Sequence, residues 1–179
     1  ENPFLAAVIA RLADPKYNLA AFGIAFAFAL IVEAPIIMIM SASVALVSGK
    51  ASFLKLRRFT YCLNSIITTG MAICLIPPVF SLIVENLIGL PPDVARVTYV
   101  TCLLLLPWPS AIGYRRFYQG VLIRRNLGRR VAYGTVIRLA AMVAAAIILS
   151  AMDIRGAYVG ASALAIGVVC EAIVCRFMV

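Results

Sequence analysis

The sequence predicts an all-α integral membrane protein, a six-helix transmembrane bundle in which the first helix is truncated. Hydrophobic residues make up 64% of the 179 residues, only 13% are charged, and the mean hydropathy is +1.06. Soluble domains contain about 45–50% apolar and about 25% charged residues. The apolar residues are also grouped in long runs, and about 20 residues of helix cross the ~30 Å hydrocarbon core of a bilayer.

These runs define the expected spans of a single domain that covers residues 1–179. We expect one partial and five complete spans, at about 1–12, 19–48, 57–84, 94–114, 130–152 and 156–179. The sequence opens on Glu1-Asn2-Pro3 inside an apolar run and reaches Val179 inside another. We therefore expect a segment of a longer protein.

Basic residues are concentrated in two of the connections between spans, and the net charge is +9. The second-to-third and fourth-to-fifth connections hold ten of the sixteen basic residues and no acid: Lys50, Lys55, Arg57, Arg58, Arg115, Arg116, Arg124, Arg125, Arg129 and Arg130. Cytoplasmic loops carry such an excess, which predicts both ends on the cytoplasmic side of the inner (plasma) membrane. A nucleic-acid partner is not expected, because the charge lies between membrane spans.

Glu33 lies near the middle of the second span, two residues before Pro35. An ionisable side chain at such a depth costs a few kcal/mol on insertion scales, about 2.5–3.5, and marks a candidate functional site. Residues equally far from the short turn between two antiparallel helices lie at similar depth. Glu1 and Glu33 are about equally far from the middle of the 14–18 connection, and both stand in a Glu-x-Pro sequence. Two carboxylates there cannot both ionise cheaply, so Glu1 and Glu33 are candidates for H⁺ or Na⁺ coupling. The alternative is that each caps backbone beside its proline or pairs with a cation elsewhere.

Prolines predict breaks in three spans. Pro35 removes a helical hydrogen bond in the second span, Pro77 and Pro78 interrupt the third, and Pro107 and Pro109 interrupt the fourth. Such breaks are tolerated where neighbouring helices or a cavity satisfy the backbone.

After the last of these breaks, Arg115 and Arg116 are expected to mark the inner interface. Tyr114, Phe117, Tyr118 and Gln119 would then begin a basic, partly amphipathic extension along that interface. The extension is expected to serve as a topology anchor, with contact to anionic headgroups or an anionic substrate as the alternative.

The last two spans each carry one charge on a face of small residues. Reflection about their turn places Arg138 opposite Glu171, which predicts a buried ion pair with a structural role. The alternative is that Arg138 faces a cavity and contacts an anion. Asn64 in the third span is a further polar candidate for the cavity.

The residues do not favour an enzyme. Histidine is absent, the acids are scattered, and the five cysteines form no CxxC pair. No catalytic residues, no metal site and no cofactor beyond a coupling H⁺ or Na⁺ are expected.

Three segments resemble a known family. They are Ala20-Ala21-Phe22-Gly23, then Glu33-Ala34-Pro35, and then Tyr114-Arg115-Arg116-Phe117-Tyr118-Gln119-Gly120. In this order and topology they resemble the amino-terminal half of a MATE-type transporter of the multidrug/oligosaccharide-lipid/polysaccharide (MOP) superfamily. The resemblance extends to bacterial relatives of the progressive-ankylosis protein.

The resemblance implies one lobe of a twelve-helix, inverted-V transporter whose second six-helix lobe is missing from this sequence. It further implies alternating access in the lipid bilayer, with H⁺- or Na⁺-coupled export or antiport of an organic or anionic solute. Family coupling often uses an acidic residue of the first helix, a position that maps onto Glu1. The alternatives are a flippase for a lipid-linked substrate, a non-transporting scaffold subunit and a membrane-embedded lipid-modifying enzyme.

Overall fold

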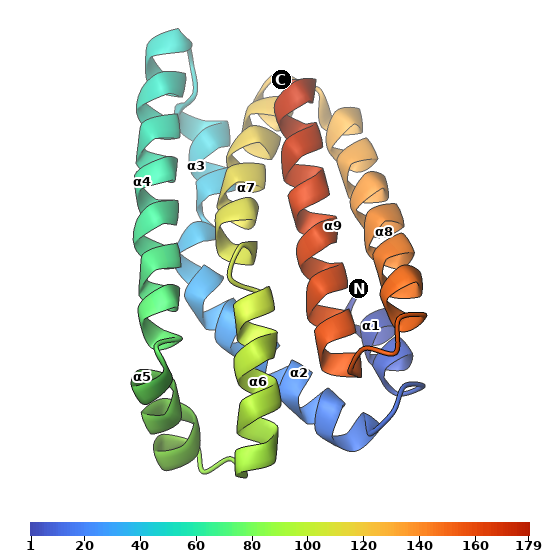
Figure 1. Cartoon of the computed structure of the whole chain (residues 1–179). Helices are drawn as coiled ribbons and strands as arrows, with labels where there is room; N and C mark the ends of the chain where they lie inside the picture. The colour runs from blue at the N-terminus through green and yellow to red at the C-terminus, as the bar shows by residue number, and fades with distance from the viewer.

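The computed structural model describes all 179 residues and contains helices joined by short turns, with no strand, which confirms the expected all-α class (Figure 1). The elements in chain order are α1 (Asn2–Ile9), α2 (Pro15–Glu33), the 3₁₀ helix η1 (Ala34–Ile36), α3 (Ile39–Leu46), α4 (Lys50–Cys74), α5 (Pro77–Ser81), the π-helix η2 (Leu82–Leu87), α6 (Pro92–Leu104), α7 (Trp108–Arg124), α8 (Gly128–Ser150) and α9 (Gly156–Met178).

Four helical stretches are long and apolar enough to cross a membrane. They are Pro15–Leu46, Pro92–Arg124, Gly128–Ser150 and Gly156–Met178. A fifth is added if α4 and the following Pro77–Leu87, which meet at a bend of 75°, count as one broken span. These stretches support a membrane-embedded protein, whereas α1 has only eight residues.

Each proline singled out in the sequence lies at a break in the helices. Helix α2 ends at Glu33, and Pro35 lies in the short 3₁₀ turn that leads to α3. Pro77 and Pro78 open α5 at the 75° bend after α4. Proline has no N–H to donate, and its ring clashes with the carbonyl four residues earlier, so each break follows from the local sequence.

A third break separates α6 from α7. Helix α6 ends at Leu104, Pro107 caps α7, and Pro109 occupies its first turn, where a missing N–H leaves no hydrogen bond unmade. The two helices remain part of one long apolar stretch (Figure 1).

Helix α7 lies inside the bundle, among several other helices. It contacts α2, α3, α4, α8 and α9, and it continues without a break to Arg124. Its second half is buried, including Arg115, Phe117 and Gln119. The expectation of an interfacial extension after Arg115 was therefore wrong. Arg115, Phe117 and Gln119 are buried because α7 packs against α3, α4 and α9 over this stretch.

Small residues allow α7 to approach its neighbours closely. A Cβ atom on Gly120 would lie 2.5 Å from the Cβ of Ser43 and 2.6 Å from the backbone oxygen of Met40, both in the segment that includes α3. Closely packed transmembrane helices commonly use glycine in this way. With α7 in this position, Arg115 faces Glu171 of α9 and Arg116 faces Glu33 at the end of α2.

Candidate functional site

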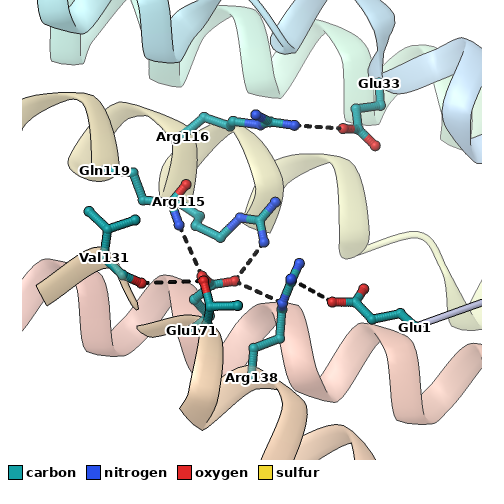
Figure 2. Close-up of polar contacts among 9 residues, drawn as sticks. Glu1, Glu33, Arg115, Arg116, Gln119, Val131, Arg138 and Glu171 are labelled. Atoms are coloured by element: carbon teal, nitrogen blue, oxygen red, sulfur yellow. Dashed lines mark hydrogen bonds and ion pairs between the residues drawn. The ribbon is translucent and has the colours of Figure 1, made fainter. Parts of the chain in front are cut away.

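Glu171 lies at the centre of a buried polar network (Figure 2). It comes from the middle of α9 and is fully buried. Arg115 of α7 donates to its Oε2 at 2.6 Å, and Gln119, one helical turn later, donates to its Oε1 at 2.9 Å. Residues four apart lie on the same helix face, so α7 presents both donors to α9.

Arg138 of α8 joins this network to the start of the chain. Its Nε lies 3.3 Å from Oε2 of Glu171, and its Nη2 lies 2.5 Å from Oε1 of Glu1. The expected contact between Arg138 and Glu171 is present, but Arg115 makes the shorter contact with the same carboxylate. Figure 2 shows Arg138 between Glu171 and Glu1.

Glu33 lies at the end of α2 and faces Arg116 of α7. The Oε1 of Glu33 is 3.9 Å from Nη2 of Arg116, which is an ion-pair contact without a hydrogen bond. Glu33 is only 4% exposed, and its Oε2 has no hydrogen-bond partner. This carboxylate is therefore the least satisfied acid of the site.

Glu1 and Glu33 each contact an arginine, Arg138 and Arg116 respectively, rather than each other. The sequence-based hypothesis placed the two carboxylates as a pair at one depth, apart from the ion pair of Arg138. The structure instead puts Glu1 within that ion-pair network, because α1 packs against α9.

Both carboxylates nevertheless line one pocket of about 410 Å³ between the helices. Asn2, Trp108, Arg115 and Arg138 contribute the other polar groups. Apolar side chains complete its wall: Phe26, Leu30, Ile112, Leu164 and Val168. Within this wall, the Nε of Arg115 and the indole Nε1 of Trp108 are buried and make no hydrogen bond. The pocket thus offers both hydrogen-bond donors and, in Glu33, an acceptor.

The site is balanced in formal charge. Three carboxylates (Glu1, Glu33, Glu171) meet three guanidinium groups (Arg115, Arg116, Arg138), and all four ion pairs of the chain lie among them. Buried charges are tolerated when paired and hydrogen-bonded. The arrangement can exchange partners, because Arg138 contacts two carboxylates and Glu171 contacts two arginines.

Asn64 lies outside this pocket, between α4 and α7. Its amide donates to the backbone oxygen of Ser110 at 3.1 Å, and a Cβ on Gly113 would lie 2.0 Å from its Oδ1. Asn64 therefore joins two helices rather than lining the cavity.

The helix breaks differ in their distance from the site. Pro35 follows Glu33 by two residues, and Pro107 precedes Trp108, whereas Pro77 and Pro78 lie at the bend between α4 and α5.

The sequence-based hypotheses missed Arg115, Arg116 and Gln119 as members of the site. The sequence carries only part of the signal, since Arg115 and Gln119 are four residues apart and share a helix face. The structure is needed to show that α7 continues for nine residues beyond Arg115, to Arg124. Nine residues of helix rise by about 13 Å, which places Arg115 well inside the helix end.

No group of three or more Cys, Asp or Glu side chains is arranged to hold a metal ion. No protein-family model, curated protein or solved structure matches the chain. Interpretation of the site therefore depends on its own geometry.

Proposed function

We propose that the chain forms one six-span lobe of a membrane transporter of the MATE or flippase type, which exports or exchanges an organic or anionic solute by alternating access coupled to H⁺ or Na⁺. The observation that carries this proposal is the network of six buried or half-buried ionisable side chains between apolar helices. We assign Glu33 the coupling role because its Oε2 has no hydrogen-bond partner.

The cost of such a network argues for a function beyond scaffolding. Each ionisable group at mid-membrane costs about 2.5–3.5 kcal/mol on insertion scales, and apolar replacements of buried ion pairs are often as stable. A protein that only held its neighbours together would gain nothing from this arrangement. A transporter uses charges that can change partners as an ion or solute enters.

The broken helices also support transport. The break at Pro35 directly follows Glu33, and the break at Pro107 directly precedes Trp108, which lines the same pocket. Transporters commonly build their binding sites where membrane helices are interrupted, because freed backbone groups and hinge freedom coincide there. Helices α2, α3, α6 and α7 would move relative to one another at these breaks.

A flippase for a lipid-linked substrate is the second candidate. The observation that favours it is the combination of Arg115 and Arg138 with an apolar wall in one pocket. Two guanidinium groups suit a phosphate group, and apolar side chains suit a lipid chain.

The test reconstitutes the full-length protein in vesicles that contain a pH-sensitive dye or ²²Na⁺. External ethidium and citrate serve as an organic cation and an organic anion, and solute-dependent H⁺ or Na⁺ flux is measured. We expect Glu33→Gln to insert normally but to lower that flux by about tenfold or more, because the coupling carboxylate is lost. Glu85→Gln is the matched control, since Glu85 is exposed and makes no ion pair. Flux of Glu33→Gln equal to that of the control would refute the coupling role.

A further inference from the structure

One end of the bundle is strongly basic. The start of α4, the connection from α7 to α8, and the end of α9 meet there (Figure 1). Nine basic residues belong to this end: Lys50, Lys55, Arg57, Arg58, Arg124, Arg125, Arg129, Arg130 and Arg176. We call this region the basic end.

No acid compensates the charge of the basic end. Every ion pair in the chain involves Arg115, Arg116 or Arg138, which belong to the central network. The four acids outside that network lie in or beside the connections α1–α2, α5–α6 and α8–α9: Asp14, Glu85, Asp93 and Asp153. The positive charge of the basic end is therefore free to attract an anionic partner from outside the chain.

The basic end contains a pocket of about 480 Å³. Lys50, Arg124 and Arg125 line one part of it. The apolar side chains of its wall are Val47, Phe53, Val121 and Val179. A cluster of positive charge beside an apolar wall, at the ends of membrane-spanning helices, matches the two halves of a phospholipid at the membrane surface.

The basic side chains of this pocket form no ion pair with an acidic side chain. Arg124 donates to the backbone oxygens of Val44 at 2.7 Å and Ala45 at 3.3 Å, and Arg125 donates to the backbone oxygen of Val179 at 3.3 Å. The carbonyls of Val44 and Ala45 orient the guanidinium group of Arg124 without neutralising it. Lys50 makes no side-chain hydrogen bond or ion pair and is exposed.

We propose that this pocket binds the headgroup phosphate of an anionic glycerophospholipid. Lys50, Arg124 and Arg125 surround the phosphate, while Phe53 and its apolar neighbours contact the glycerol and the first methylene groups. The absence of any acid among the lining residues disfavours the ammonium group of a zwitterionic lipid. This inference depends on membrane embedding alone and is independent of the transport proposal.

The experiment measures lipid retention by native mass spectrometry. The full-length protein is purified and equilibrated with mixed micelles of dioleoylphosphatidylglycerol and dioleoylphosphatidylcholine. The wild type should retain phosphatidylglycerol in preference to phosphatidylcholine. Lys50→Glu should lower phosphatidylglycerol occupancy by about tenfold, since it reverses one charge in contact with the phosphate.

Lys55→Glu is the matched control. It makes the same charge change on the same helix, also at an exposed position, but Lys55 does not line the pocket. It should change the occupancy by less than about twofold, because the side chain of Lys55 lies outside the pocket and does not contact the bound phosphate. Lys50 is the first residue of α4, where an acid is favourable to the helix, so Lys50→Glu should fold.

Three results would overturn the proposal. The first is an equal loss in Lys50→Glu and Lys55→Glu, which indicates diffuse attraction to the whole basic end. The second is a wild type without preference for phosphatidylglycerol. The third is complete displacement of the lipid by millimolar inorganic phosphate, which indicates a site for free phosphate. Arg125→Gln, with Arg129→Gln as its control, repeats the comparison without charge reversal.

Discussion

Glu171→Ala should be the most destabilising single substitution in the charged network. Glu171 is fully buried, and its carboxylate is shared by Arg115, Gln119 and Arg138. Removing one partner of a buried ion pair costs about 3–5 kcal/mol of the free energy of unfolding, because the other charge stays buried without compensation. Arg115 is 7% exposed and has no second carboxylate within ion-pair distance, so we expect the upper part of that range.

The structure also ranks the two arginines that share Glu171. Arg115 approaches at 2.6 Å with a hydrogen bond, whereas Arg138 lies at 3.3 Å, is more exposed, and retains Glu1 at 2.5 Å. We expect Arg115 and Glu171 to couple by about 2–3 kcal/mol in a double-mutant cycle, near the upper limit for contacting residues. We expect Arg138 and Glu171 to couple by less than about 1 kcal/mol, because Glu1 compensates Arg138 in the single mutant.

The assay is unfolding by sodium dodecyl sulfate in mixed micelles, followed by far-ultraviolet circular dichroism. Alanine variants of Arg115, Arg138 and Glu171 and the two double variants supply both cycles. Glu85→Ala is the control for loss of an exposed, unpaired carboxylate, and its effect should be near zero. Equal coupling energies, or a larger one for Arg138, would show that the geometry of the network does not set its energetics.

Two further substitutions test the packing of α7. Gly120→Ala should destabilise the protein by about 1–3 kcal/mol, because the new Cβ would lie 2.5 Å from the Cβ of Ser43. Gly70→Ala, on the open face of α4, should instead stabilise it by about 0.5–1 kcal/mol, because alanine has the higher helix propensity. The same unfolding assay measures whether each substitution lowers or raises the free energy of unfolding. Asn64→Ala should cost about 0.6 kcal/mol, as interhelical hydrogen bonds in membranes typically do, since it removes the bond to Ser110; a loss of several kcal/mol, or altered solute flux at full stability, would contradict this purely structural role.

Features set by local chemistry were predictable from the sequence. The breaks at Pro35, Pro77 and Pro107 follow from the missing N–H of proline, which acts whatever surrounds it. The contact between Arg138 and Glu171 followed from a short turn and equal distances along two antiparallel helices. Contacts of this kind can be predicted from the rise per residue of a helix alone.

Features that depend on contacts between distant helices were not predictable in the same way. Arg115 and Arg116 are adjacent in sequence but differ by about 100° around the helix, so one faces Glu171 and the other Glu33. Which way each points depends on where α7 packs, and α7 contacts five helices. The reflection that paired Glu1 with Glu33 used only distances along the chain and carried no information on rotation about the helix axes. In the structure Glu1 contacts Arg138 instead.

The equal number of carboxylates and guanidinium groups in the central network has a consequence for how this protein can evolve. A substitution that removes one charge leaves its partner unbalanced in a low-dielectric interior, whereas a second substitution of opposite sign restores neutrality. Lineages should therefore lose Glu171 together with Arg115, and Glu33 together with Arg116, more often than any of them singly. The paired positions should then change together across related sequences. Arg115, which makes the shortest contact with the fully buried Glu171, would be the last of the arginines to change.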